Sequence, residues 1–261
     1  MTATKMGAMT AIPDTAPGSG PVTRDTLLGG RVVIHQPALG YRVAIDPVLL
    51  AAACPARPGQ RVADLGCGTA AALLCLAARV PDLDLVGLDR DGAALALAGD
   101  SMAANRLDDR CRLVEGDVAA PPETLRLVDQ VMMNPPYLEA GEGSRSPQAW
   151  RDRAHHGGDL ADWIAGAEAI LRPKGWLTAI HRADRFDRLV ALLAPRFGAI
   201  TLIPLLPRAG AAARRVIVRA RKDARSPAIL LPPLVLHDAT GRYSVAAERV
   251  LQGGAALDDV L

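Results

Sequence analysis

The stretch Asp64-Leu65-Gly66-Cys67-Gly68-Thr69-Ala70 decides the fold of this chain, because it joins an apolar run to a helical pattern through two glycines. Residues 61–65 predict a buried strand, and residues 70–79 predict a helix. Glycines at such a turn let the backbone approach a bound ligand closely, and the first N–H groups of the helix attract an anion. We therefore expect a strand, a ligand-binding loop and a helix here.

Short apolar runs and helical patterns keep alternating beyond this stretch. The runs 199–204 and 214–221 are joined by a loop too short for a crossover helix, so they predict an antiparallel pair. The alternation as a whole predicts an α/β fold with a mostly parallel sheet and helices on both faces. The other expected strands are 84–88, 112–115, 128–133 and 176–181, and the other expected helices are 92–105, 159–171 and a helix with Phe186, Leu189, Val190 and Leu193 on its buried face.

Composition limits the class of protein further. The chain has 261 residues, 50% apolar and 22% charged, which is enough for one sizeable core. The longest apolar run has nine residues, against about 20 for a membrane span, and the N-terminus lacks an apolar signal stretch. We therefore expect a cytoplasmic protein without a membrane helix. The expected organisation is a disordered tail (1–22), an N-terminal segment (23–59), the main domain (60–225) and a C-terminal extension packed on that domain (226–261).

The four cysteines are Cys54, Cys67, Cys75 and Cys111, and no two of them form a CxxC pair. A chain of this length does not need disulfides to be stable. The spacing therefore predicts free buried thiols rather than disulfides or a zinc site, and we expect no metal.

The charge of Asp64 helps to separate two kinds of nucleotide-like cofactor. Gly66-x-Gly68-x-x-Ala71 also fits the dinucleotide fingerprint, with Asp89 downstream as the ribose ligand. A carboxylate two residues before the first glycine would repel a pyrophosphate, whereas a cationic cofactor would be attracted to it. S-adenosylmethionine (SAM) carries a sulfonium and an ammonium group, and its carboxylate suits the helix N-terminus. Asp89 would then accept both ribose hydroxyls, and Asp117 would accept the adenine amino group.

The second chemical signal is Asn134-Pro135-Pro136-Tyr137, at the end of the expected strand 128–133. If the Asn134 side-chain oxygen and the Pro135 carbonyl accept the N–H groups of a planar nitrogen, its lone pair is directed toward the sulfonium methyl group. The prolines stiffen the turn, and Tyr137 offers a face on which a flat base stacks. The transfer needs no general base, because the proton leaves after methylation. Taken alone, the motif also fits a tight turn with a core tyrosine.

Together, in this order, the two motifs resemble those of class I SAM-dependent methyltransferases that modify amino nitrogens. Within that superfamily the chain looks like the bacterial tRNA (adenine-N6) methyltransferases that act beside the anticodon of a valine tRNA. Ala70 replaces a glycine common in the cofactor loop, a small change, and residues 151–158 are less typical. The resemblance covers about 23–257 and includes Gly29-Gly30-Arg31-Val32, Gln36-Pro37-x-x-Gly40-Tyr41-Arg42, Asp46-Pro47-Val48-Leu49-Leu50, His181-Arg182-Ala183 and the basic run 214–221.

The resemblance implies a fold, a reaction and a set of site residues. It implies a Rossmann-like sheet of seven strands with the sixth and seventh antiparallel, SAM as methyl donor, and S-adenosylhomocysteine as product. The acceptor would be adenine N6 at position 37 of a tRNA, and the segment 23–59 would close over the cofactor. The implied catalytic residues are Asn134, Pro135, Pro136 and Tyr137. The implied cofactor ligands are Asp46, Asp64, Gly66, Cys67, Gly68, Asp89, Asp117 and Asn134.

A basic segment indicates what the substrate is. Seven basic residues between Arg208 and Arg225, against Asp223 alone, give a local charge of +6 and leave −4 for the rest of the chain. Such a segment suits RNA, with Tyr137, Arg215, Arg219 and Arg221 as substrate contacts. The same charges also fit an edge strand whose arginines prevent sheets from sticking together. The sequence leaves both interpretations open, and it does not separate a monomer from a dimer.

Two other functions fit part of the pattern. A glutamine-N5 methyltransferase of the release-factor type uses the same Asn-Pro-Pro-Tyr chemistry, although only about 60 residues precede the glycine motif here. A nicotinamide-dependent oxidoreductase would fit the glycine fingerprint alone. His155 and His156 lie in the long polar stretch 138–158, and we expect them to be solvated rather than catalytic.

Overall fold

The predicted alternation of strands and helices is confirmed by the computed structural model, which describes residues 21–39, 42–136 and 159–261. Residues 1–20, the Gly40-Tyr41 pair and the stretch that holds Tyr137, His155 and His156 lie outside the described residues. In chain order the central elements are β3 (Arg61–Leu65), α2 (Ala71–Arg79), β4 (Asp84–Asp89), α3 (Gly92–Ala104), β5 (Cys111–Glu115), β6 (Val128–Met133), α5 (Leu160–Ile170), β7 (Leu171–Arg182) and α6 (Phe186–Leu193).

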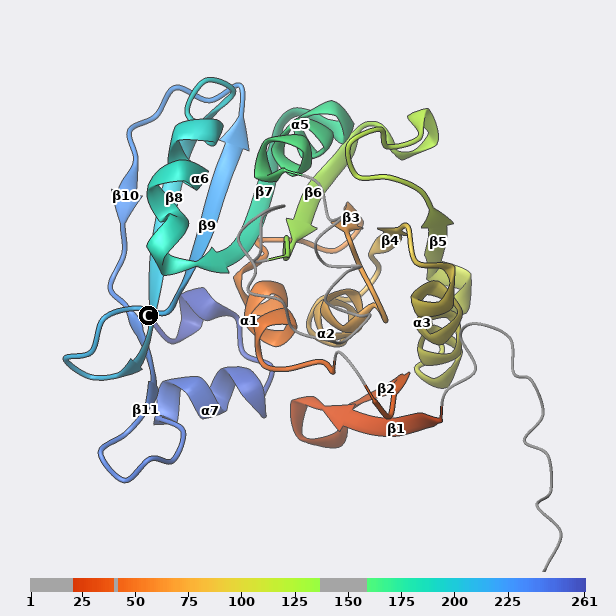
Figure 1. Ribbon diagram of the computed structural model, residues 1–261, viewed down its shortest axis with the longest axis horizontal. Helices are drawn as coiled ribbons and strands as arrows, with labels where there is room; N and C mark the ends of the chain where they lie inside the picture. Colours follow the sequence, from red (N-terminus) through yellow and green to blue (C-terminus); the bar gives the residue numbers. More distant parts are fainter. Residues whose placement is uncertain (1–20, 40–41, 137–158) are drawn as a thin grey trace, which may run out of the picture.

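The central sheet has the strand order β5-β4-β3-β6-β7-β9-β8 (Figure 1). Strands β5, β4, β3, β6 and β7 are parallel to one another. Strand β9 (Arg215–Lys222) is antiparallel to β7 and to β8 (Phe197–Arg208), as predicted for the last two strands. Two short strands, β10 (Ile229–Leu230) and β11 (Leu234–His237), extend the sheet by pairing in parallel with β8. The sequence analysis did not predict these two.

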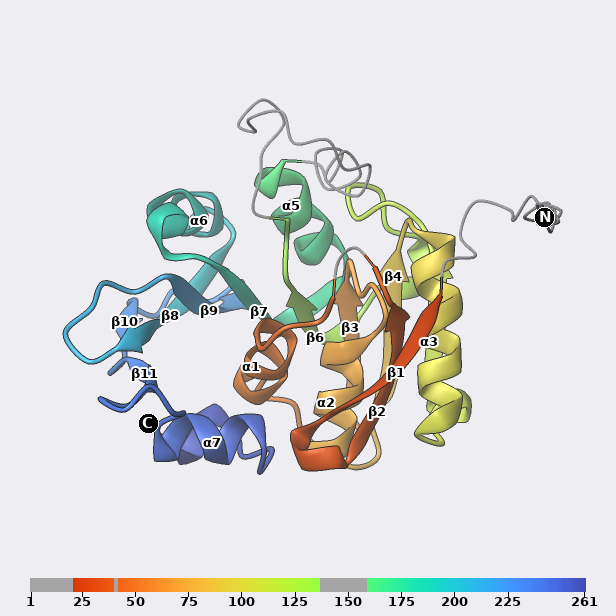
Figure 2. The same ribbon diagram turned by 60° about the horizontal axis from the view of Figure 1, so that its bottom comes forward.

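Helices cover both faces of the sheet, so its strands are apolar on both sides. One apolar cluster joins the sheet to α1 (Asp46–Ala53), α2, α3 and α7 (Val245–Leu251), and a second joins it to α5 and α6. Successive residues of β3 alternate between the clusters, with Val62 in the first and Ala63 in the second. Figures 1 and 2 show the two layers of helices with the sheet between them.

The N-terminal segment contains a hairpin that the sequence analysis did not predict. Strands β1 (Val22–Leu27) and β2 (Val32–Pro37) pair in antiparallel and lie against α3 (Figure 2). The Val33 amide donates to Asn105 Oδ1 and the His35 amide donates to Ser101 Oγ, both at 2.9 Å. These bonds fix one edge of the hairpin to the domain. Closure of segment 23–59 over a cofactor stays a prediction.

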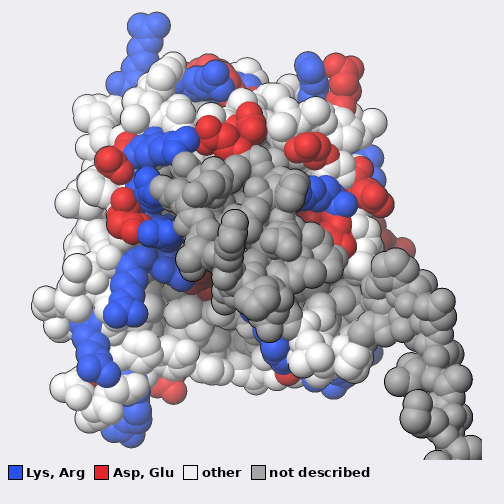
Figure 3. All heavy atoms as spheres, viewed as in Figure 1, with Lys and Arg blue, Asp and Glu red and all other residues white. Residues whose placement is uncertain are grey.

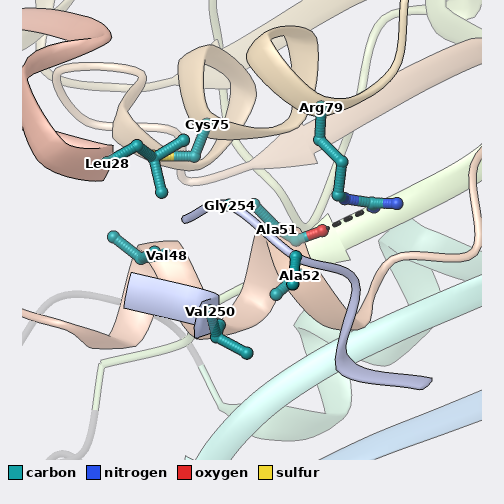
Figure 4. A pocket seen from close by; sticks show the side chains of 9 residues that line it. Leu28, Val48, Ala51, Ala52, Cys75, Arg79, Val250 and Gly254 are labelled. Carbon is teal, nitrogen blue, oxygen red and sulfur yellow. Dashed lines mark hydrogen bonds between the residues drawn. The ribbon is translucent and has the colours of Figure 1, made fainter. Parts of the chain in front are cut away.

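The C-terminal segment packs against α1 and against the turn between β1 and β2. Arg31 donates to the Gly253 carbonyl at 2.7 Å, which ties the hairpin turn to the end of α7. Arg79, the last residue of α2, donates to the carbonyls of Ala51 and Cys54 at 2.8 and 2.6 Å. Figure 4 shows Arg79 reaching Ala51 beside a small cavity between α1, α2 and the C-terminal segment. The Arg79 bonds thus supply side-chain donors to carbonyls at the C-terminal end of α1.

Several local predictions were wrong. Strand β7 begins at Leu171, directly after α5, rather than at residue 176; a positive φ of 63° at Lys174 and a register shift opposite β6 accommodate the extra residues. Helix α2 begins at Ala71, one residue later than expected. Phe186 is 48% exposed rather than buried. It is the first residue of α6, where fewer neighbours cover a side chain.

The cysteines and the membrane prediction can also be compared with the structure. Cys54, Cys67, Cys75 and Cys111 are free thiols, and all but Cys111 are buried. Within the described ranges, no helix is long and apolar enough to cross a membrane. Among the same residues, no three His, Cys, Asp or Glu side chains form a group that would hold a metal ion.

Candidate active site

The predicted cofactor residues lie in one row at the carboxyl edge of the parallel strands. In sheet order, Asp117 follows β5, Asp89 ends β4, the loop Gly66–Ala70 follows β3 and Asn134 follows β6. The chain continues from β3 toward β4 on one side, whereas β6 and β7 lie on the other. The position between β3 and β6 is therefore a topological switch point, where open α/β sheets bind ligands.

The two glycines of the loop have different structural roles. Gly66 and Gly68 adopt φ values of +68° and +53°, which favour glycine. A Cβ on Gly66 would lie 2.3 Å from Cη2 of Trp163, so packing against α5 excludes a side chain there. A Cβ on Gly68 would meet no described atom within 4 Å. The backbone at Gly68 thus leaves open space beside it for a ligand.

Ala70 has a left-handed backbone conformation, with φ of 65° and ψ of 23°. This conformation costs a non-glycine residue about 1–2 kcal/mol, which gives a physical reason for glycine at this position. The substitution is therefore less neutral than its size suggests. No described side chain caps the first N–H groups of α2, so they remain free to bind the carboxylate of a ligand.

The Asp89 carboxylate connects the glycine loop to the turn after β4. Its Oδ2 accepts the Gly68 amide at 2.7 Å, and its Oδ1 accepts the Asp91 amide at 2.9 Å. A carboxylate has about four lone-pair positions, so each oxygen still has one for a ribose hydroxyl. In the next loop, Asp117 Oδ1 accepts the Ala119 amide at 2.9 Å, which fixes the turn after β5.

Asp64 is a buried carboxyl group at the end of β3, with 3% of its surface exposed. Burial raises its pKa well above the usual value of 3.8, and the charge of Asp89 raises that pKa further. Burial also raises the pKa of the Cys67 thiol, and the two carboxylates add to this effect. Cys67 is therefore a neutral thiol in the loop and not a nucleophile.

Asn134 presents a buried hydrogen-bond acceptor at this edge. Its Oδ1 has no donor in the described part of the chain. Pro135 is buried, so the turn that carries this oxygen is packed against the domain. Leaving a buried acceptor without a partner costs about 1–3 kcal/mol, an arrangement that suits a site whose donor is a ligand. The predicted role of Tyr137 lies outside the described residues.

Asp46 lies near the same edge, on helix α1, which packs beside α2 on one face of the sheet. It lies in the first turn of α1, and its Oδ2 accepts from Arg215 Nε at 3.1 Å. Arg215 is the first residue of β9, and in the antiparallel register it lies opposite Arg182, the last residue of β7. The ion pair thus holds the N-terminal segment near the carboxyl edge, where its predicted contact with a cofactor stays a prediction.

The three arginines predicted to contact substrate do not lie together. Arg221 lies about 20 Å along β9 from Arg215. In the strand register it is opposite Trp176 of β7, and its guanidinium lies over the Trp176 ring. Arg219 is 8% exposed and donates to both Asp258 oxygens, at 2.8 and 2.5 Å. Of the three, Arg215 alone lies at the carboxyl edge. The edge-strand interpretation is also wrong, because β9 lies between β7 and β8.

A second group of arginines at the carboxyl edge was not among the predicted substrate contacts. Arg182 ends β7, Arg185 lies in the short turn after it, and Arg188 lies in the first turns of α6. Figure 3 shows Lys and Arg side chains in a column along one border of the undescribed residues, with some acidic side chains between them. Their three-residue spacing directly after a predicted strand was the available signal.

Comparisons with known proteins identify relatives of this chain. The family model described as methyltransferase small domain matches residues 42–203. A tRNA1(Val) (adenine(37)-N6)-methyltransferase from Porphyromonas gingivalis is 30% identical over 82% of this chain and 88% of its own. A release factor glutamine methyltransferase from Gloeobacter violaceus is also 30% identical, but over 58% and 56% of the two chains. The crystal structure of a predicted O-methyltransferase from Agrobacterium tumefaciens superposes with a TM-score of 0.68, at 26% identity over 81% of this chain and 97% of its own.

Proposed function

Because this chain belongs to the methyltransferase small domain family, we propose that it transfers a methyl group from SAM to the N6 amino group of an adenine in tRNA, at position 37 beside the anticodon. Relatives that carry this activity in their names match over most of both chains. The chain is a SAM-dependent methyltransferase; its acceptor is what we propose.

The residues at the carboxyl edge fit SAM as the cofactor. SAM, when bound, supplies an electrophilic methyl group on a positively charged sulfur. Asp89 would hold the ribose hydroxyls, Asp117 the adenine amino group and the first amides of α2 the carboxylate. Asp64, buried beside the loop, would face the ammonium group. The open space at Gly68 would allow SAM to lie close to the main chain of the loop. We propose that Asp46, Gly66 and Cys67 also line this cofactor site.

The buried Oδ1 of Asn134 is the observation that carries the proposal. In this proposal it accepts one N–H of the adenine amino group and the Pro135 carbonyl accepts the other. The nitrogen lone pair is then directed out of the ring plane, and positioning of this kind lowers the barrier without a base. A carbon–nitrogen bond forms as the carbon–sulfur bond breaks, and the surplus proton passes to water. Pro136 stiffens the turn, and Tyr137 would stack on the adenine.

Two alternatives have less support. The same chemistry serves a glutamine amide, but the release-factor relative matches over little more than half of each chain. A nicotinamide-dependent oxidoreductase is not supported, because the matching family is one of methyltransferases. We propose RNA as the partner, in the cytoplasm.

The experiment is to incubate the protein with isotope-labelled SAM and unmodified tRNA, and to analyse the nucleosides by mass spectrometry. We expect labelled N6-methyladenosine from wild-type protein. Asn134→Ala should abolish turnover and leave the dissociation constant for SAM within a few-fold, because the lost oxygen serves the acceptor.

Asn134→Asp is the matched control, because a carboxylate keeps the acceptor oxygen while it replaces the amide donor by a second acceptor and adds a negative charge. It should keep measurable activity. A fully active Asn134→Ala variant contradicts the catalytic role, and label on a release-factor glutamine rather than on RNA contradicts the proposed substrate.

A further inference from the structure

Phe186 is an exposed aromatic side chain next to the candidate active site. It is 48% exposed, whereas Leu189 and Leu193 of the same helix are fully buried. Among the described aromatic residues, only Tyr243 is comparably exposed, at 37%, and it stacks on His237 in the C-terminal segment. Phe186 is in neither apolar cluster of the core. The fold therefore leaves much of this ring uncovered.

The topology places Phe186 at the catalytic edge. Met133 pairs with Ala179, so Asn134 is level with Ile180 on the neighbouring strand, about 4.8 Å away in the sheet. Strand β7 ends two residues later, and α6 begins with Phe186 after one short turn. Figure 1 shows this end of α6 beside the end of β7.

Several arginines lie on segments at the same edge of the sheet. Arg182, Arg185 and Arg188 come from its own segment, and Arg214 and Arg215 come from the start of β9, which pairs with the end of β7. Arg182 and Arg188 are held by Asp184 and Asp159, but their side chains remain 32% and 35% exposed. These partly exposed guanidinium groups place positive charge on this edge, which attracts the phosphate groups of a nucleic acid.

Exposed aromatic rings beside arginines are the means by which proteins hold single-stranded RNA. A target adenine must leave its stack to reach a buried acceptor such as Asn134 Oδ1, and its neighbour then loses a stacking partner. We propose that Phe186 is a stacking platform for a nucleobase adjacent to the methylated adenine. This inference rests on the proposed function, and it adds a substrate contact that the sequence motifs did not indicate.

The experiment compares Phe186→Leu with Phe186→Tyr. Leucine keeps an apolar side chain of similar size and loses the ring, whereas tyrosine keeps the ring. For Phe186→Leu we expect the KM for tRNA to rise about 5- to 150-fold, which is the stacking free energy of about 1–3 kcal/mol converted at about 1.4 kcal/mol per factor of ten. For Phe186→Tyr we expect a KM within about twofold of wild type.

Tyr243→Leu is the control, because it removes the other exposed ring, which lies beside β11 with β7, β9 and β8 between it and the strand that carries Asn134, and it should leave the KM unchanged. The dissociation constant for SAM and the unfolding midpoint should stay constant in all three variants. A wild-type KM in Phe186→Leu overturns the inference, and so does a parallel loss of SAM affinity. If the wild-type protein methylates no RNA, the proposed function fails first and the inference falls with it.

Discussion

The ionised form of Asp64 is disfavoured in the absence of a ligand, for two reasons that act in the same direction. Its carboxyl group is buried, and the nearby Asp89 charge adds to the cost of ionising it, so its pKa lies well above 3.8. The folded protein therefore binds this proton more tightly than the unfolded chain does. The stability that the group contributes is present below pH 3.8 and is lost as the pH rises through the raised pKa.

A cationic ligand should reverse this dependence. If the ammonium group of SAM faces Asp64, binding favours the ionised carboxylate, so the dissociation constant for SAM should fall as the pH rises through the raised pKa. Isothermal titration calorimetry between about pH 4.5 and 7 would measure this, below the range in which an α-amino group itself titrates. Asp64→Asn should bind SAM more weakly and lose the pH dependence. An unchanged pH dependence in this variant would exclude Asp64 as its source.

At the scale of single residues, the sequence predicted the placement of the candidate site residues better than their local conformation. Asp89 and Asn134 were identified by their place after a strand, and the parallel sheet brings their ends together as expected. The left-handed backbone of Ala70 and the exposure of Phe186 were not predictable in the same way. The backbone conformation at Ala70 depends on how the loop packs in the folded protein. Phe186 is the first residue of its helix, and an apolar helical pattern does not distinguish an end residue from an interior one.

Helix α5 holds two of the proposed cofactor loops at once. Trp163 fills the space beside Gly66, and a Cβ on Gly166 would lie 1.9 Å from the Val118 carbonyl, in the segment after Asp117. Residues 163 and 166 are three apart and thus lie on one face of the helix. This face fixes the distance between the glycine loop and the Asp117 loop.

Gly166→Ala tests this packing. The added methyl group must displace either α5 or the segment at Val118, so we expect a loss of about 1–3 kcal/mol in the free energy of unfolding and weaker SAM binding. Gly99→Ala is the matched control, since that glycine also lies inside a helix but its added Cβ would meet only Leu113 Cδ1, at 4.0 Å. It should be neutral or stabilising by up to about 1 kcal/mol. Equal stability of the two variants in urea denaturation would show that α5 does not pack this tightly.

At the scale of elements, the strands and helices of the alternating part were predictable because each has a regular apolar pattern. The hairpin β1-β2 and the strands β10 and β11 were not, because they are short and gain their stability from partners far along the chain. Strand β9 shows the same limit. Its arginines fitted an edge strand as well as an RNA contact, but Asp46 and Asp258 pair with Arg215 and Arg219 from distant segments, so the strand is accommodated inside the sheet.

The arginines of the basic segment have different surroundings at the carboxyl and amino ends of the parallel strands. At the carboxyl edge, Arg214 is exposed and Arg215 is paired with Asp46 beside the site. Farther along β9, the C-terminal segment covers Arg219, whose bonds lower the pKa of Asp258. At the opposite edge, Arg221 lies over Trp176 and donates to the Lys174 carbonyl. The basic segment predicted from the sequence is thus divided among the carboxyl edge, a structural contact with the C-terminal segment and a distant surface.

This division predicts different effects for two exposed arginines of the same strand region. Arg214→Gln should weaken tRNA binding and reduce the slope of log affinity against log salt by about 1, because one phosphate contact is lost. Arg221→Gln changes the chain by the same charge but lies about 20 Å away along β9, so it should leave both quantities unchanged. Binding isotherms at several salt concentrations would compare them, with SAM affinity as a check on folding. Equal losses in the two variants would mean that RNA contacts the whole basic segment and that the carboxyl edge has no special part in holding it.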